Sequence, residues 1–321
     1  MKFASTLLPA FLFALPGQAA PQIEETPDII TLSLGEVEVL VYHKAEWEAP
    51  AAAGEVYDRS AFIGPIRNSR GHVVTDTHPP DHWHHMGLWH PWTHTVINGT
   101  RTDFWNLKKK EGTVRYVETL DLLEESADGG AGFIVRQDHV MFQPEEKVAV
   151  EETLEVILHD SDEPHVIDYV WKQIPKVDME LPPHLYGGGL GFRGRRDWTE
   201  GKITVLTSEG KTREDGHATR ARWIRYTGLD DSGQNTSVVL MNAPTNHDHP
   251  QRMRVHPKEP FFNYAPTQEH PWKLETDVPV SMAYRILIYA GKPTPETLEE
   301  QWSAYLAASP AVSQESSEEG S

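Results

Sequence analysis

Apolar residues of this chain recur mainly at every second position, in many short runs with turn residues between them. The alternation is clear at residues 30–34 and 37–41. It is the pattern of a strand, because successive side chains of a strand point to opposite faces. Similar runs lie at 114–123, 133–142, 148–158, 166–174, 203–207, 223–227, 238–241 and 280–289. Many strands at short spacing, with turns such as Asp128-Gly129-Gly130 between them, predict an all-β antiparallel sandwich.

One helix is predicted, at residues 295–306. Thr294 can cap its first turn, Pro295 suits the first helical position, and Glu296 carries the charge that favours a helix N-terminus. Leu298, Trp302, Tyr305 and Leu306 then form one apolar stripe. We expect this C-terminal helix to pack on the sandwich and not to form a site.

The two ends of the chain differ from the rest in composition. A single charge at Lys2 precedes a short apolar run, and small residues follow at Ala19 and Ala20. This is the pattern of a secretory signal peptide, and the run is shorter than the roughly 20 apolar residues that span a bilayer. We predict cleavage after Ala19 or Ala20, and a periplasmic or secreted protein. Residues 307–321 are small, polar and acidic, which predicts a disordered tail. No repeat or linker divides the remainder, so 21–306 is predicted to be a single β-sandwich domain.

Charge and cysteine content narrow the classes of partner. Lys and Arg number 29 against 48 Asp and Glu, which gives a formal net charge of −19, and there is no cysteine. The negative charge disfavours nucleic acid, and no segment predicts a membrane span. Thiolate metal sites and disulfides are excluded. The expected partner is a small molecule or a carbohydrate.

Histidines are concentrated between residues 72 and 94, where seven of the seventeen lie. Pro79 and Pro80 prevent a regular helix there, and an extended segment would place two imidazoles, at positions 82 and 84, on one face. Imidazoles next to a carboxylate can act as acid and base near neutral pH. The predicted catalytic residues are His82, His84, His85 and Asp81.

The same histidines could instead bind a divalent metal, with His82 and His84 as ligands. The zincin pattern H-E-x-x-H is absent, and the spacing does not require a metal. A divalent metal is therefore an alternative, and the sequence calls for no certain cofactor.

Tryptophans accompany the histidines and indicate a class of substrate. Indole faces lie well against the C–H faces of sugars, whose hydroxyls need polar partners around the rim. Trp89 and Trp105 are candidates for the first role, and Arg67 and Asp103 for the second. Core packing is an equally good interpretation of both tryptophans.

Several motifs resemble a bacterial family labelled methane oxygenase PmoA. They are the stretch 62–67, the pattern Asp81-His82-x-His84-His85-x-Gly87-Leu88-Trp89, the run 103–105, and further matches at 188–193, 210–212, 220–223, 246–250 and 284–285. The resemblance covers about residues 35–306 in order. It implies a β-supersandwich similar to galactose mutarotases and a role in carbohydrate breakdown. The label does not imply a membrane protein, since this chain has no predicted span.

The resemblance also extends the set of candidate residues. Arg193 and Lys211 join Arg67 as groups that would hold hydroxyls or a carboxylate, and Asn246 and His249 are further substrate-binding candidates. Met86 stands where the commoner pattern has an arginine, which implies a different ligand contact here.

These features lead to three functional hypotheses. The first is an exported carbohydrate-active enzyme, of epimerase, lyase or hydrolase type, with a histidine acid/base site. Hydrolysis normally requires two carboxylates, for which Asp81 and Asp103 are candidates. The alternatives are a metal-dependent enzyme with the same histidines as ligands, and a sugar-binding protein without catalysis.

Overall fold

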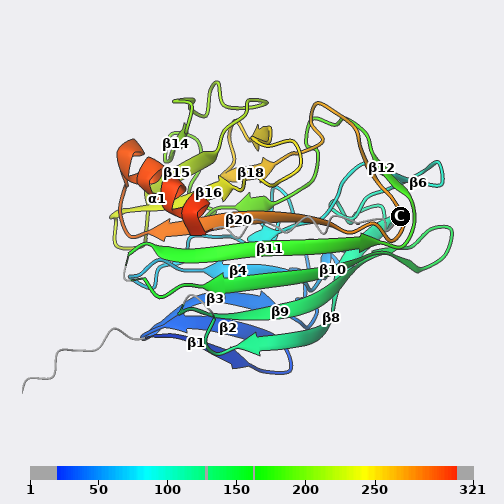
Figure 1. Ribbon diagram of the computed structural model, residues 1–321, viewed down its shortest axis with the longest axis horizontal. Coiled ribbons are helices and arrows are strands. Elements are labelled where there is room, and N and C mark those ends of the chain that lie inside the picture. Colours follow the sequence, from blue (N-terminus) through cyan, green and yellow to red (C-terminus); the bar gives the residue numbers. More distant parts are fainter. Residues whose placement is uncertain (1–19, 127–128, 162, 309–321) are drawn as a thin grey trace, which may run out of the picture.

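A computed structural model describes residues 20–126, 129–161 and 163–308 (Figure 1). The predicted signal peptide, apart from its last residue, lies outside the described residues, as do residues 309–321 of the predicted tail. Within the described ranges the chain forms three antiparallel sheets, a C-terminal α-helix and the short 3-10 helix η1 (Glu55–Tyr57).

The first sheet has eight strands and is built mainly from the N-terminal part of the chain. Its order is β1 (Pro21–Glu25), β2 (Ile29–Leu34), β3 (Val37–His43), β4 (Phe62–Ile66), β5 (Leu88–Trp89), β13 (Gly191–Arg193), β18 (Phe261–Tyr264) and β17 (Met253–Val255). The last four strands are short and come from distant parts of the sequence. That half of the sheet therefore brings distant loops together.

The second sheet also has eight strands, and most of them are long. Its order is β14 (Thr204–Thr207), β15 (Trp223–Leu229), β16 (Asn235–Asn242), β20 (Val280–Tyr289), β11 (His165–Pro175), β10 (Lys147–Leu158), β9 (Ala131–Met141) and β8 (Gly112–Leu123). A third, four-stranded sheet lies at one end of the molecule, in the order β19 (Trp272–Leu274), β12 (Met179–Leu181), β6 (Thr95–Ile97) and β7 (Thr100–Thr102).

The core lies between the two large sheets. Strand β10 shows how alternation builds it, since Leu154 and Val156 are buried while Thr153 and Glu155, which alternate with them, are partly exposed. These side chains join one apolar cluster with residues of the first sheet such as Leu32 and Leu40. The predicted antiparallel sandwich is confirmed.

Helix α1 (Pro295–Ala308) covers the outer face of the second sheet (Figure 1). The backbone N–H of Thr297 donates to Thr294 Oγ1 at 3.2 Å, so Thr294 caps the helix as predicted. Leu298, Trp302 and Tyr305 pack against side chains on the outer face of β16 and β20. Leu306, which the sequence placed in the same stripe, is 42% exposed. The helix continues two residues beyond the predicted end.

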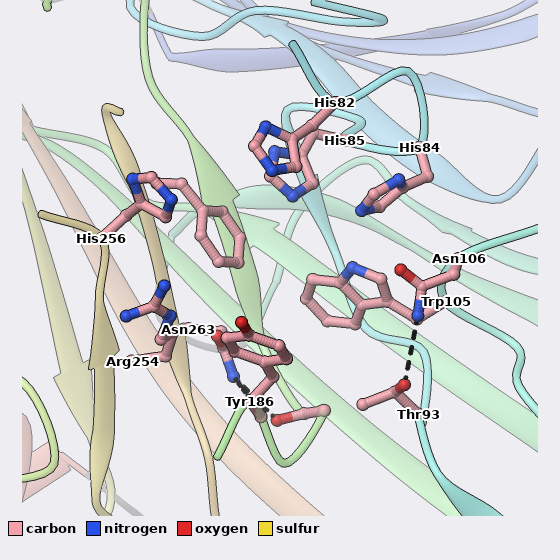
Figure 2. A pocket seen from close by; sticks show the side chains of 12 residues that line it. His82, His84, His85, Thr93, Trp105, Asn106, Tyr186, Arg254, His256 and Asn263 are labelled. Atoms are coloured by element: carbon pink, nitrogen blue, oxygen red, sulfur yellow. Dashed lines mark hydrogen bonds between the residues drawn. The ribbon is translucent and has the colours of Figure 1, made fainter. Parts of the chain in front are cut away.

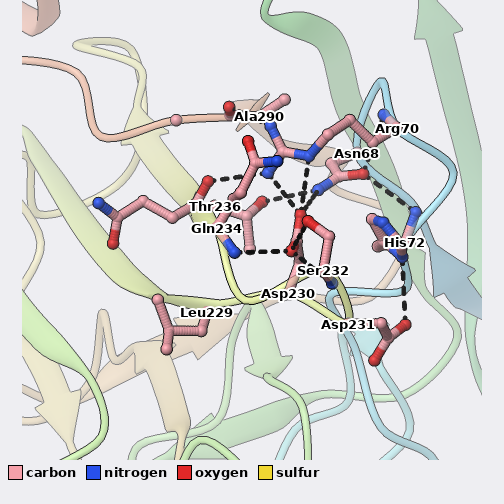
Figure 3. A network of polar contacts seen from close by, with 12 residues as sticks. Asn68, Arg70, His72, Leu229, Asp230, Asp231, Ser232, Gln234, Thr236 and Ala290 are labelled. Atoms are coloured by element: carbon pink, nitrogen blue, oxygen red, sulfur yellow. Dashed lines mark hydrogen bonds and ion pairs between the residues drawn. The ribbon is translucent and has the colours of Figure 1, made fainter.

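A buried polar network joins the loop after β4 to the β15–β16 turn (Figure 3). Arg70 Nε donates to Asp230 Oδ2 at 2.8 Å, and Asn68 Nδ2 donates to Thr236 Oγ1 at 3.2 Å. Asp230 Oδ1 also accepts the backbone N–H of Ser232 at 2.9 Å. The aspartate therefore shapes its own turn and ties the two sheets together.

None of the described helices is long and apolar enough to cross a membrane.

Candidate functional site

A cavity opens beside the short strands of the first sheet, where the histidine segment meets three distant loops. The segment 79–85 forms turns and is not extended. Gly87, at φ 65°, lets the segment turn into β5, because a Cβ there would lie 2.4 Å from the carbonyl oxygen of Ile63. The histidines are thus held against the sheet by a bend that only glycine accommodates.

The cavity encloses about 160 Å³ (Figure 2). Its lining residues are His82, His84, His85, Thr93, Trp105, Asn106, Tyr186, Gly188, Arg254, His256, Phe261 and Asn263. A second, more open hollow of about 460 Å³ shares His82, His84, Asn106 and Tyr186 with it, and adds Asp81 and Asp103. Together they make a groove large enough for a small polar molecule.

Asp81 and Arg193 fix the orientation of His82. Arg193 is 1% exposed and holds Asp81 in a bidentate pair, with Nη1–Oδ2 and Nη2–Oδ1 distances of 2.8 and 2.9 Å. Asp81 Oδ2 also accepts from His82 Nδ1 at 2.7 Å. Burial raises the pKa of Asp81, but the hydrogen bonds from Arg193 and His82 outweigh it and hold the pKa below its usual value. Asp81 is therefore an ionised acceptor, and the neutral form of His82 has its lone pair on Nε2.

His85 stacks between two rings behind His82. Its ring centroid lies 4.7 Å from that of His82 and 4.3 Å from that of Phe261, with nearly parallel planes. Burial, reinforced by the neighbouring imidazoles, lowers its pKa well below the ordinary value. Arg193 Nη1 approaches His85 Nδ1 at 3.4 Å, and a guanidinium only donates. These partners assign the proton of neutral His85 to Nε2.

Two further imidazoles on the cavity wall are neutral at pH 7. Burial, aided by nearby positive groups, lowers the pKa of His84 to about 3 and that of His256 to about 4. His256 Nδ1 accepts the backbone N–H of Glu259 at 2.8 Å, which assigns its proton to Nε2. His84 makes no hydrogen bond to any residue that the structure describes. Its polar atoms are therefore free for a ligand.

Aromatic rings form much of the remaining wall. Trp105 and Phe261 line the cavity, and their ring centroids are 6.0 Å apart. Tyr186 is 47% exposed and forms part of the rim. It belongs to a loop in which three consecutive glycines have positive φ, and a Cβ at Gly188 would lie 3.0 Å from the backbone nitrogen of Thr93. Those glycines let the loop lie close against the cavity wall.

Arg254 and Asn263 lie on adjacent strands on the side of the cavity away from His84 (Figure 2). They are partners in the β17–β18 register.

No aspartate or glutamate lines the cavity. Among the described residues, no group of three or more His, Cys, Asp or Glu is arranged to hold a metal ion. The histidine rings contact one another edge to face or face to face, and the centroids of His82 and His84 are 5.7 Å apart.

The structure brings most of the predicted catalytic residues together, but it leaves four substrate-binding candidates elsewhere. Arg67 pairs with Glu38, and Lys211 pairs with Asp215 at 3.1 Å. Asn246 bonds the backbone of Ala283 through both ends of its amide. His249 lies parallel to Trp302 of α1, 6.1 Å between ring centroids. None of the four lines the cavity.

The other candidates support the cavity from behind or from its edge. Asp103 accepts the backbone N–H groups of Trp105 and Asn106 at 2.9 and 3.0 Å, so it holds the loop that presents the indole of Trp105. Trp89 is 1% exposed and packs behind the cavity. Met86 belongs to the same apolar cluster, so the departure from the commoner arginine pattern lies outside the cavity lining.

Sequence reasoning missed the wall formed by Tyr186, Arg254, His256, Phe261 and Asn263. Its members are scattered over almost eighty residues, and no dense motif marks them. The available signal was the pair Arg254-x-His256, because residues two apart at a strand end share a face.

The sequence profile of a protein family matches residues 30–303, and its description is a family of unknown function, DUF6807. The chain belongs to this family. The match spans the cavity and both large sheets, apart from β1 and the first residue of β2. The description of this family does not mention PmoA. No curated protein matches the chain.

Solved structures similar to this chain are distant from it in sequence. Heparan sulfate lyase HepC from Pedobacter heparinus matches with a TM-score of 0.38 and 8% identity, over 89% of this chain and 38% of the lyase. GH36 alpha-galactosidase AgaA from Geobacillus stearothermophilus matches with a TM-score of 0.31 and 9% identity, over 85% and 41%. A galactose mutarotase related enzyme from Lactobacillus acidophilus matches with a TM-score of 0.29 and 10% identity, over 84% and 97%. The chain spans less than half the length of the first two. At these TM-scores the likeness carries no functional information.

Proposed function

We propose that this protein is an exported carbohydrate-active enzyme that transfers protons on a sugar bound in the His82 cavity. The observation that carries the proposal is the complementary protonation of its imidazoles. His82 offers a lone pair on Nε2, since its Nδ1–H donates to Asp81. His85 and His256 offer N–H donors on Nε2, since their Nδ1 atoms face donors. One fixed acceptor beside two hydrogen-bond donors suits removal of a proton by His82 with stabilisation of the oxygen that becomes negative.

The roles of the carboxylates favour epimerisation or elimination over hydrolysis. A glycosidase of the usual kind needs two carboxylates flanking the scissile bond. Asp81 is committed to Arg193 and His82, and Asp103 is committed to the backbone of its own loop. His82 would accept a proton from a carbon or hydroxyl of the sugar, and Asp81 would stabilise the imidazolium that forms. His85 or His256 would donate a hydrogen bond to the oxygen on which negative charge develops. The His82 imidazolium would then return its proton, to carbon in an epimerisation or to the departing oxygen in an elimination.

A sugar is supported as the ligand by the mixture of wall residues. The rim ring of Tyr186 offers an exposed flat face for C–H groups, and Trp105, which is 6% exposed and packs in the apolar cluster with Trp89, lines the cavity beside it. The imidazoles and amides provide hydrogen bonds for hydroxyls. The resemblance to PmoA-labelled proteins, which rests on the same His82-x-His84-His85 pattern, supports a role in carbohydrate breakdown. The apolar run before Ala19 supports export.

Proton exchange with solvent tests the proposal directly. Protein lacking residues 1–19 would be incubated in D2O with a panel of neutral and acidic mono- and oligosaccharides, and deuterium at sugar carbons would be followed by NMR. We expect exchange or conversion of at least one sugar, with a loss of about a hundredfold or more in His82→Ala. The control is His270→Ala, which removes an exposed imidazole outside the cavity. Equal rates for His82→Ala and the unaltered protein would refute the role of His82.

A non-catalytic sugar-binding protein is the second candidate. It is favoured by the low pKa of His84, about 3, and of His256, about 4, because imidazoles that remain neutral are better hydrogen-bonding groups than bases. Binding of a sugar without exchange or turnover would support this reading. A metal-dependent enzyme would instead show stoichiometric metal by elemental analysis and a loss of turnover on chelation.

A further inference from the structure

The guanidinium of Arg254 lies at the cavity without a carboxylate partner. Its Nη1 donates weakly to the carbonyl of Val255 at 3.4 Å, and its Nε is buried with no partner in the described structure. The ring of Tyr186 lies 4.9 Å from its central carbon. No described Asp or Glu lies within ion-pair distance of it, and none lines the cavity.

The neighbouring Arg252 shows the more usual arrangement in this chain. It binds Glu269 through two hydrogen bonds of 2.7 and 2.6 Å, and it lines a different hollow. The formal net charge is −19, so acidic partners for an arginine are abundant on this protein. A partly buried cation with an unsatisfied donor is costly unless something pairs with it. Arg254 is therefore a cation at the cavity that no described carboxylate neutralises, and it can pair with an anion brought by a ligand.

The groups beside Arg254 suit a sugar that carries this anion. Asn263, its register partner on β18, donates its amide N–H to the carbonyl of Tyr186 at 2.7 Å and leaves Oδ1 buried without a partner. That oxygen is an acceptor to which no described donor is bonded. His256, two residues after Arg254, offers an Nε2–H donor. A cation, an acceptor and a donor thus lie together on one wall.

We infer that the ligand is an acidic sugar, whose carboxylate is bound by Arg254 while its ring lies between Trp105 and the histidines. The inference rests on the proposed function for the choice of a sugar. A guanidinium presents parallel N–H groups that match the two oxygens of a carboxylate, which is why a uronate fits better than a sugar with no charge. Figure 2 shows Arg254 and Asn263 on one side of the cavity, and His84 and Trp105 on the other, with His82 and His85 between them at one end.

Calorimetric binding of matched sugars tests the inference. Galacturonate, glucuronate and mannuronate would be compared with galactose, glucose and mannose, together with galacturonamide, which keeps the shape and loses the charge. We expect at least one uronate to bind about ten- to a hundredfold more tightly than its neutral parent and its amide, the range for a hydrogen-bonded charge pair. Arg254→Met should remove this preference and Arg254→Lys should retain part of it. Arg252→Met, which makes the same change of charge outside the cavity, should keep it in full.

The possible failures are distinguishable. Equal binding of neutral and acidic sugars, with proton exchange intact, would overturn the acidic ligand and leave the proposed enzyme standing. Tighter binding of galactose 6-sulfate than of galacturonate would overturn the assignment of the bound anion as a carboxylate. Binding of uronate that depends on Arg254 without any exchange would support the inference and refute catalysis. The unfolding midpoint of each variant shows that a lost preference is not a lost fold, and retention of the preference in a folded Arg254→Met would overturn the inference.

Discussion

At the scale of single residues, the site depends on which nitrogen of each imidazole carries the proton. His82 differs from its neighbours because its Nδ1 faces a carboxylate, whereas His85 and His256 face donors. The difference comes from the surroundings, since the side chains are chemically identical. It explains how one cavity can offer a base and two hydrogen-bond donors at the same pH.

Asp81→Asn tests this dependence with little change in volume. An amide can donate to His82 Nδ1, which would move the imidazole proton to Nε2 and remove the lone pair from the cavity. We expect turnover on the active sugar to fall about a hundredfold or more, measured as kcat. Asp197→Asn is the control, because Asp197 also pairs with an arginine but lies outside the cavity. Unchanged kcat in Asp81→Asn would show that the carboxylate does not set the tautomer.

The buried imidazoles also predict how stability depends on pH. The pKa of His84 is about 3 in the folded chain and that of an unperturbed histidine is about 6.5, so between these values the unfolded chain binds the extra proton. Stability is therefore full above about pH 6.5 and falls as the pH drops toward 3, by up to about 1.4 kcal/mol per pH unit for each such imidazole. Urea unfolding at pH 7.5, 6 and 5 should show this fall, and His84→Gln should make it shallower. A slope that is unchanged in His84→Gln would contradict the low pKa.

The site residues that sequence could predict are those in the dense segment. Asp81, His82, His84 and His85 are close in the chain and in the fold. Arg254 and Asn263 could not be found in this way, because their meeting depends on the order of short strands in the first sheet. Resemblance and charge favour Arg67 and Lys211 as substrate-binding residues, but in the fold they pair with their acidic neighbours Glu38 and Asp215.

At the scale of elements, long strands were predictable and short ones were not. Strands β8–β11 are eleven or twelve residues long, and the period of two is plain in β11 and in most of β10. Strand β5 has two residues and β13 has three, too few for any period. Both lie at the cavity, where pairing is decided by Gly87 and by contacts with distant chain segments. The parts that position the site are therefore the parts that local pattern describes least well.

Helix α1 gives a prediction about packing. Leu298 is fully buried against the outer face of the second sheet, while Leu306 of the same helix is 42% exposed. We expect Leu298→Ala to lower the free energy of unfolding by about 2–5 kcal/mol, through lost contacts and a cavity. Leu306→Ala is the matched control and should change it by less than about 0.5 kcal/mol. Denaturant unfolding measures both, and equal effects would mean that the helix does not pack through Leu298.

At the scale of the whole molecule, the N-terminal segment determines where the protein is expected to be processed. The apolar run after Lys2 and the small residues at 19 and 20 predict that a signal peptidase removes the N-terminus. Protein purified from its native host should begin at Ala20 or Pro21, as determined by mass spectrometry of the intact chain. Retention of residues 1–19 on the purified protein would refute export by this route.

The two large sheets are also joined by polar groups inside their core. Glu152 of β10 is fully buried and accepts from His139 Nε2 at 3.0 Å and from Gln173 Nε2 at 2.5 Å. Gln137 donates to it at 2.5 Å and accepts from Tyr42 of the first sheet at 2.9 Å. Burial raises the pKa of Glu152, but the hydrogen bonds from His139 and His90 outweigh burial and lower it to about 2. Glu152 is therefore the ionised centre of a network that crosses the sandwich.

Removing this centre should be far more costly than removing its neighbour. Glu152→Ala leaves several buried donors without an acceptor, so we expect a loss of about 3–5 kcal/mol in the free energy of unfolding. Glu151 is next in the chain, but its side chain is 35% exposed and pairs with Arg136 and Lys176, so Glu151→Ala should cost about 1 kcal/mol or less.

Because the pKa of Glu152 is lowered, its contribution is present above the unfolded pKa of about 4.3 and is lost as the pH falls toward 2. Urea unfolding at pH 7 and at pH 3 should therefore show a smaller difference between Glu152→Ala and the unaltered protein at the lower pH. A difference that is equal at both values would mean that the network is held by shape and hydrogen bonding alone, without the charge of Glu152.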